Sequence, residues 1–474
     1  MGKIKQLFSA QDMTEGRPWR LILNFTLPLI LGNFAQQLYN TVDSMVVGQY
    51  IGDNALSAVG VSIPILFVLT VLFIGLSTGA SIMVSQYFGA KKRDELGYTI
   101  GNCLSLTVIV SLVTMSVYFV LPWVLKILKT PDILYKDALI YLKIVLLGIP
   151  AIAYYNILSG ILRGLGDSAS ALFYLILSAV INILLDLTFV KYLHWGIAGV
   201  AIATVIAQGI SAVLCFLKLK HMKEVFSLEK RHYRFKKTIV RDMISLGLPS
   251  GATQAIFSLA GLLVQSLVND YGEFFVAASF IVMRVDGFAM LPNFSFGIAM
   301  TTYTGQNVGA GKMERVYTGI KEGLIVALSI SAMMTVLILM FGKQLMSLFS
   351  NTEELVNYAR KLMFILAPGY LAFSITQSLS GTMRGAGDTV TPLIIGIINT
   401  VFIRVPAAYI LTYLTRSAVY PKGRPEMIIF SLMLAWILGA VVNILVFRKR
   451  KWEKKLIIPP TRSEERRVGK ECRS

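Results

Sequence analysis

Two aspartates stand inside long apolar runs of this 474-residue sequence, where a carboxylate is least expected. Asp43 lies in the run 19–47, and Asp186 lies in the run 170–190 with Asn182 four residues before it. A charge at the centre of a bilayer costs about 2.5–3.5 kcal/mol on insertion scales, so carboxylates retained there point to function. Residues spaced i, i+4 share one helix face. We therefore expect Asn182 and Asp186 to face Asp43 across a common interior.

The chemistry open to this pair is ion exchange. Two carboxylates held away from water cannot both ionise cheaply, because desolvation and like-charge repulsion each oppose the second negative charge. Such a pair can bind a proton near neutral pH and release it elsewhere. Oxygens of Asp43, Asn182 and Asp186 could instead ligate Na⁺, and neither reading needs an organic cofactor. The residues alone leave both ions open, and also a plain capping role at a helix end.

The elements that must position these residues are apolar helices. Hydrophobic residues make up 55% of the chain and charged residues only 15%, whereas a soluble domain averages about a quarter charged. Each apolar run can cross about 30 Å of hydrocarbon as a helix, and the alternating pattern of a membrane barrel is absent. We predict an all-α membrane protein with twelve spans near 19–47, 55–86, 95–121, 138–160, 170–190, 196–217, 240–268, 275–305, 316–341, 356–381, 390–414 and 427–447.

The net charge of +19 fits a membrane protein better than a nucleic-acid partner. Lysines and arginines gather in alternate loops, as the positive-inside rule requires. We therefore expect a multi-pass protein of the cell inner membrane with both termini in the cytoplasm. Its expected partners are the lipid bilayer and small molecules, with no nucleic acid, and we expect it to act as a monomer.

The chain repeats itself. LSGILRGLGD (158–167) matches LSGTMRGAGD (379–388) at seven of ten positions, and the same offset places Pro28 on Pro249. A related match joins SQYFGAKKRDE (85–95) to GQNVGAGKMER (305–315). Because six spans return the chain to its starting side, the halves should be related by a pseudo-two-fold axis along the membrane normal. We predict an N-terminal lobe at 1–217, a cytoplasmic linker at 218–240, a C-terminal lobe at 241–455 and a tail at 456–474, whose last stretch, 462–474, resembles a vector or adapter scar.

These residues resemble the multidrug and toxic compound extrusion (MATE) family. The resemblance rests on NTVDSMVVGQYIG (40–52), the two RGxGD turns, the SQYFGA and GQNVGA segments and NILLD (182–186). It covers the chain up to about residue 455 and implies twelve helices in two six-helix lobes. Members of the family export organic cations, drugs and metabolites in exchange for H⁺ or Na⁺.

The resemblance also assigns a cation site in the first lobe. Family members with such a site use residues that match six positions of this chain: Tyr39, Asp43, Tyr141, Asn182, Asp186 and Thr204. Other members carry acidic residues in the seventh and tenth spans, where this chain has Gln254, Gln265 and Gln377. Coupling is therefore expected in the first lobe. The family also suggests a hinge at Pro28, which precedes Asp43 on one predicted helix.

Charged residues elsewhere admit a structural and a functional reading. Three charged residues lie in spans of the second half: Arg284, Asp286 and Arg404. In the structural reading, Arg404 pairs with Asp286 and satisfies backbone carbonyls near Pro406. In the functional reading, it contacts substrate. Together with the three glutamines, these three charged residues are our second-lobe candidates. The duplicated turns carry further charges, which we interpret as ion pairs closing an inner gate: Arg163 with Asp167, and Arg384 with Asp388.

Three functions compete. The first is an antiporter that exports small hydrophobic or cationic compounds by alternating access in exchange for H⁺ or Na⁺. The second is a lipid-linked oligosaccharide flippase, which would be expected to have a strongly basic central cavity. The third is a membrane enzyme, which we do not expect because no convergent nucleophile or metal set is present, and no Walker motif suggests an ATP-driven pump.

Overall fold

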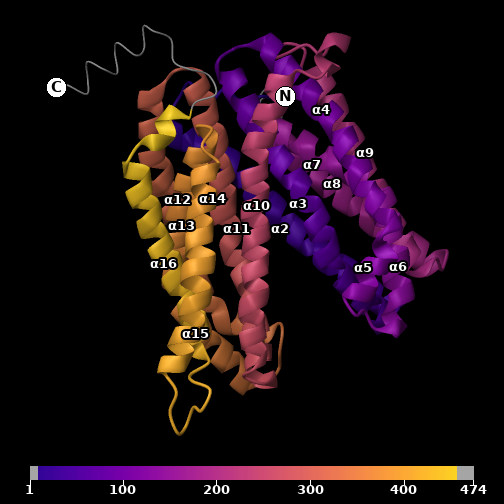
Figure 1. Ribbon diagram of the computed structural model, residues 1–474, viewed down its shortest axis with the longest axis vertical. Coiled ribbons are helices and arrows are strands. Elements are labelled where there is room, and N and C mark those ends of the chain that lie inside the picture. The colour runs from indigo at the N-terminus through magenta and orange to yellow at the C-terminus, as the bar shows by residue number, and fades with distance from the viewer. Residues whose placement is uncertain (1–8, 456–474) are drawn as a thin grey trace. The chain divides into compact units, whose positions relative to one another are not determined.

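The computed structural model describes residues 9–455, and no strand occurs within that part of the chain. Its first half is formed by seven long helices (Figure 1): α2 (Pro18–Tyr50), α3 (Asp53–Gly89), α4 (Arg93–Met115), α6 (Asp132–Leu147), α7 (Ile149–Gly164), α8 (Ser168–Asp186) and α9 (Gly196–His221). A short helix, α5 (Leu121–Ile127), precedes α6, and the one-turn 3₁₀ helix η1 (Ser116–Phe119) follows α4.

The second half follows the same order. Its helices are α10 (Lys237–Asn269), α11 (Glu273–Gly309), α12 (Met313–Ser347), α13 (Glu353–Gly385), α14 (Val390–Ile397), α15 (Val405–Leu414) and α16 (Glu426–Arg448). Two π-helical stretches interrupt this pattern, η2 (Leu187–Tyr192) after α8 and η4 (Ile398–Arg404) between α14 and α15. One-turn 3₁₀ helices, η3 (Lys230–Tyr233) and η5 (Lys451–Lys454), precede α10 and follow α16.

The predicted spans match these helices closely. Among residues 9–455, eleven helical spans are long and apolar enough to cross a membrane, and α6 with α7 makes a twelfth if that bent pair is one span. The axis turns by 54° at the break. Gly148 stands there because a Cβ would lie 2.1 Å from Val205 Cγ2, and Pro150 removes a backbone donor in the first turn of α7. The all-α membrane class is therefore confirmed.

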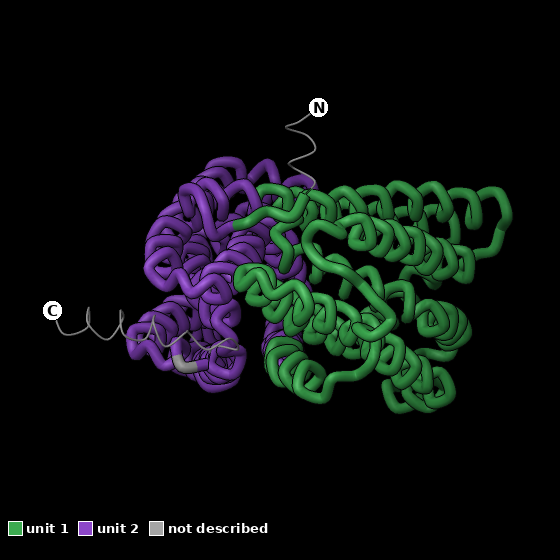
Figure 2. The backbone as a smooth tube through the Cα atoms, turned by 90° about the horizontal axis from the view of Figure 1, so that it is seen from above, with its two compact units in different colours: residues 1–12, 27–251 green, residues 13–26, 252–474 purple. Residues whose placement is uncertain are grey.

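The chain divides into two compact units, each with its own core (Figure 2). The first unit contains residues 9–12 and 27–251, and the second contains 13–26 and 252–455. Phe73, Leu142 and Val200 belong to the core of the first unit. Tyr370 and Trp436 belong to the core of the second, with ring centroids 5.7 Å apart. Two of the three boundaries fall inside helices, α2 and α10, close to the repeat-related Pro28 and Pro249.

The stretch predicted as a linker, 218–240, therefore lies within the first unit instead of between two units. Its ends are helical, because α9 runs to His221 and α10 begins at Lys237. Residues 222–236, which we call the connector, contain no α-helix and only the single turn η3. The predicted tail at 456–474 lies outside the described residues.

Candidate functional site

The first unit brings the two membrane aspartates together. Asp43 projects from α2 and Asp186 is the last residue of α8. Asp186 is fully buried, and the two carboxyl groups lie within hydrogen-bonding distance of each other. Neither Asp43 Oδ1 nor Asp186 Oδ1 accepts a hydrogen bond from an N–H or hydroxyl donor of the described residues. Two carboxyl groups can bond directly only if they share a proton, so a proton between the oxygens would stabilise this contact.

Asn182 connects the acid pair to its surroundings. The side-chain amide is fully hydrogen-bonded in the orientation in which Nδ2 donates to Asp186 Oδ2 at 2.9 Å and to the Tyr39 hydroxyl at 3.2 Å. Its Oδ1 then accepts from the backbone N–H of Thr204 at 3.0 Å. Because Asn182 is 1% exposed, these bonds form away from solvent. The amide thereby fixes the Asp186 carboxylate in one orientation.

A tyrosine completes the cluster from a third direction. Tyr141 is 7% exposed on α6 and interacts electrostatically with both Asp43 and Asp186. The structure thus places all six residues assigned to the cation site in one cluster, drawn from α2, α6, α8 and α9. The π-helical turn η2 begins directly after Asp186. Such distortions are frequent at functional sites, and nothing in our reading of the sequence had indicated this one.

The second unit holds a different charged group, made of Asp286 on α11, Tyr370 on α13 and Arg404 at the end of η4. The Tyr370 hydroxyl lies within hydrogen-bonding distance of Asp286, and Arg404 attracts the same carboxylate. No ion pair within 4 Å joins Asp286 to Arg404, and the buried Asp286 Oδ1 and Arg404 Nε have no hydrogen-bond partner among the described residues. The structural pairing predicted for Arg404 is therefore looser than an ion pair. Sequence reasoning missed Tyr370, which no motif distinguishes.

The other second-unit candidates do not join that group. Arg284 is exposed on α11, with its guanidinium 4.7 Å from the centroid of Phe280. Gln265 is exposed on α10 and donates to Asn269 at 2.9 Å. Gln254 and Gln377 are half-buried on α10 and α13. The second unit therefore provides scattered polar side chains, with the half-buried Asp286 and Arg404 as charges of opposite sign.

The two duplicated turns are built differently from the predicted ion pairs. Asp167 caps α8, since its Oδ1 accepts from Ser170 N at 2.9 Å and its Oδ2 from Ser170 Oγ at 2.7 Å. Lys218 Nζ lies 4.0 Å from that carboxylate. Arg163 donates to Ser159 Oγ at 2.7 Å. Capping donors thus occupy both oxygens that we had expected to bind arginine.

The second turn repeats this arrangement. Asp388 accepts from Thr391 N at 3.1 Å and Thr391 Oγ1 at 2.6 Å, and Lys455 Nζ lies 3.9 Å away. No ion pair joins Arg384 to Asp388 among the described residues, so the predicted pairing is wrong here. The physical reason is that a short acidic side chain before a helix bonds the free N–H groups of the first turn more readily than a distant guanidinium.

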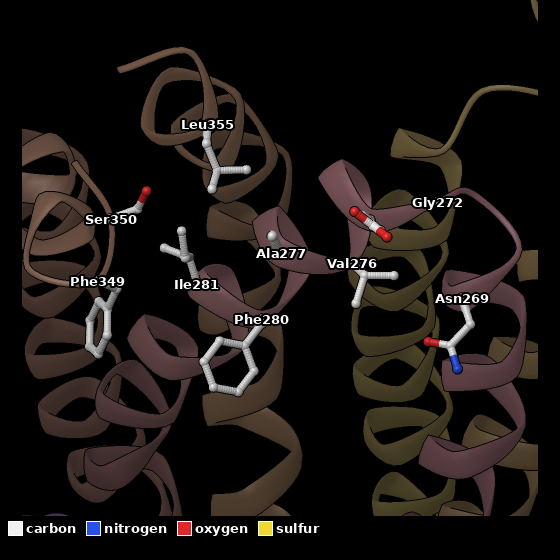
Figure 3. A pocket seen from close by; sticks show the side chains of 10 residues that line it. Asn269, Gly272, Val276, Ala277, Phe280, Ile281, Phe349, Ser350 and Leu355 are labelled. Carbon is white, nitrogen blue, oxygen red and sulfur yellow. The ribbon is translucent and has the colours of Figure 1, made fainter. Parts of the chain in front are cut away.

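The second unit has surface pockets that are lined by its own residues. Figure 3 shows one of about 530 Å³, where α10 passes into α11 beside the α12–α13 turn. Phe280, Ile281 and Phe349 give it an apolar wall, and Asn269 and Glu273 supply its polar groups. It is shallow and open, so we assign it no role in the chemistry of the acid pair.

Comparison with known proteins identifies the family. The MatE family profile matches residues 28–188 and 249–410, two segments that begin at the repeat-related prolines. The probable multidrug resistance protein YoeA of Bacillus subtilis is 30% identical over 437 residues, which cover 90% of this chain and 94% of that protein. The chain belongs to the MATE family. The family is one of multi-pass membrane transporters that export small molecules, and the resemblance found in the motifs is confirmed.

Further MATE relatives agree in length and fold. The probable multidrug resistance protein NorM of Thermotoga maritima is 24% identical, with 94% of this chain and 95% of that protein covered. A crystal structure described as MATE in complex with MaL6 superposes with a TM-score of 0.86 at 23% identity, over 93% of this chain and 97% of that one. The twelve-helix, two-lobe MATE fold is therefore confirmed, and the flippase alternative is not favoured.

Proposed function

We propose that this MATE transporter exports small hydrophobic or cationic compounds across the cell membrane in exchange for an ion bound at the acid pair. The observation that carries the proposal is the contact between the carboxyl groups of the half-buried Asp43 and the buried Asp186, with no other donor of the described residues on either Oδ1. A site that must share a proton or hold a cation has two charge states. Alternating access needs such a two-state element, which an ion gradient can bias.

The direct contact between the two carboxyls favours H⁺ as the exchanged ion. Na⁺ would separate the oxygens and take several of them as ligands, for which Asn182, Tyr39 and Thr204 supply further candidates. The names of the relatives support drugs as cargo. In the second unit, Asp286 and Arg404 retain unsatisfied polar atoms, which fits a role in contacting the polar part of a substrate. We further propose an inner-membrane monomer with cytoplasmic termini, in accord with the positive-inside distribution.

Transport in proteoliposomes tests the proposal. The purified chain is reconstituted with a fluorescent cationic dye, and a pH gradient or a Na⁺ gradient is imposed separately. We expect dye transport under the pH gradient at constant Na⁺. The transport rate should fall at least a hundredfold in Asp43→Asn and in Asp186→Asn. Asp53→Asn, an exposed aspartate in the first turn of α3, is the matched control and should transport normally. Movement driven only by Na⁺ would assign that ion instead, and full transport by Asp43→Asn would remove the coupling site.

A further inference from the structure

The connector is docked onto helix α4 by a specific set of contacts. Of its fifteen positions, 222–236, Phe226 and His232 alone are buried, with 3% and 0% of their surface exposed. Asn102 of α4 donates to the carbonyls of His232 and Arg234 at 3.0 and 3.1 Å, and its Oδ1 accepts from Lys236 N at 2.7 Å. One buried amide therefore satisfies three backbone groups of the connector directly before α10.

Two glycines of α4 make room for the histidine. A Cβ at Gly101 would lie 2.4 Å from the carbonyl oxygen of His232, and a Cβ at Gly97 would lie 3.1 Å from His232 Cε1. Any larger side chain would push the connector off the helix. The face of α4 is therefore shaped to receive this ring.

The hydrogen bonds of His232 define its protonation state. Nε2 lies 3.0 Å from Asp94 Oδ1, and a carboxylate requires a donor there. Nδ1 lies 3.0 Å from the backbone nitrogen of Glu229, whose N–H requires an acceptor. The Glu229 side chain in turn caps η3, which closes a reciprocal capping box. Both bonds exist together only in the neutral ring with its hydrogen on Nε2.

The charged groups around the ring are already paired with one another. Asp94 is 51% exposed and already binds Arg231 at 2.7 Å, and Glu229 binds the same guanidinium at 2.9 Å. Lys236 stands 4.4 Å from the ring centroid of Tyr98, whose edge packs on the imidazole at 4.7 Å. The two carboxylates facing the histidine are thus partly neutralised by the Arg231 guanidinium, and the Lys236 ammonium group is close by. A charged ring here would be enclosed beside carboxylates that Arg231 already pairs.

We propose that His232 is a proton-operated latch that holds the connector on α4 when neutral and releases it when protonated. A proton on Nδ1 would point at the Glu229 N–H, so the capping box must open. A charged ring is also better solvated in water than in the pocket formed by Gly97, Gly101 and Tyr98, so it moves out of that pocket. Release of the connector frees the residues that directly precede α10, which begins at Lys237. The latch does not involve the acid pair, so it works independently of the ion or substrate that the chain uses.

Hydrogen–deuterium exchange of the full-length protein in lipid nanodiscs tests the latch. Exchange of the 226–237 peptide is followed from pH 5 to pH 8 and corrected for the intrinsic rate at each pH. The N–H groups of Glu229, His232 and Lys236 are the reporters, because each donates within the docked connector. We expect protection to be at least tenfold lower at pH 5 than at pH 8, because protonation of the ring removes the acceptor of the Glu229 N–H.

Two variants complete the design. His232→Gln keeps a donor for Asp94 and does not titrate, so its protection should be independent of pH. His221→Gln is the matched control, since His221 is exposed at the end of α9 and contacts Leu217 O in its own helix; it should follow the wild-type profile. ¹⁵N spectra of labelled His232 at pH 8 should show the Nε2–H tautomer, which needs no variant. Protection that stays constant or rises on acidification, or a cationic ring at pH 8, overturns the proposal.

Discussion

Replacing Asp167 by alanine tests the capping role that the structure gives to the duplicated turns. The substitution removes both acceptors of Ser170, whose N–H and hydroxyl are bonded at 2.9 and 2.7 Å. Ser170 is 2% exposed, so water does not easily replace the lost partner. Capping aspartates contribute about 0.5–2 kcal/mol, and a buried donor left without an acceptor belongs at the upper end. We expect Asp167→Ala to lower the free energy of unfolding by about 2 kcal/mol.

The Asp167→Asn variant separates the contribution of the capping hydrogen bond to stability from the contribution of the carboxylate charge. Burial raises the pKa of Asp167 above its ordinary value, although the bonds from Ser170 and the nearby Lys218 act in the opposite direction. A carboxyl whose folded-state pKa is raised stabilises the fold fully below its unfolded pKa of about 3.9, and loses that contribution as the pH rises through the folded value. Asp167→Asn keeps an acceptor and does not ionise. Its penalty relative to the wild type should therefore shrink between pH 4.5 and pH 7.5.

The assay is equilibrium unfolding in mixed detergent–lipid micelles, followed by loss of helicity at both pH values. Asp388→Ala in the second turn is the internal comparison, because Asp388 is 2% exposed and bonds Thr391 in the same way. Asp388→Ala should lower the free energy of unfolding by a similar amount. The reasoning is refuted if Asp167→Ala is neutral, or if the Asp167→Asn penalty grows with pH, which would mean that the ionised carboxylate stabilises the folded state.

Two further substitutions probe close packing and the segment before α2. Gly79→Ala would place a Cβ 2.5 Å from the Met243 carbonyl oxygen, so we expect a loss of about 1–3 kcal/mol and lower folded yield; Gly60→Ala in the same helix meets nothing within 4 Å and should be tolerated. Gln306→Ala removes the acceptor of the buried Met13 N–H, bonded at 2.8 Å. Amide exchange at Met13 should then rise at least tenfold, and unchanged exchange would show that the bond does not hold this segment.

The helices of the fold could be predicted from the sequence because a bilayer demands about twenty consecutive apolar residues per span. The predicted run 390–414 has the same limits as the span formed by α14, η4 and α15. The close approach of Gly148 to Val205 at the bend between α6 and α7 could not be predicted, since the two residues lie far apart along the chain. The two π-helical stretches were not predicted either, because side-chain periodicity does not reveal one inserted residue.

The candidate site was predicted unevenly. The i, i+4 spacing of Asn182 and Asp186 fixes a shared helix face, and the hydrogen bond between them follows from it. The Arg–Asp pairing was predicted wrongly although the sequence contained a signal for capping. Asp167 and Asp388 each precede a hydroxyl residue by three positions, which is the spacing of a helix cap. The docking of His232 on α4 had no local signal. It joins residues more than a hundred positions apart.

The repeat, the prolines and the unit boundaries converge on α2 and α10. Each helix begins in one unit and continues in the other, and the change falls one residue before Pro28 and two residues after Pro249. A proline removes one backbone bond from its helix, which lowers the cost of bending there. Bending at these points leaves the core of each unit intact, because neither core includes the helix segment of the other unit. Pro28 as the hinge remains a prediction, and its physical ground is that Asp43 follows it on the same helix.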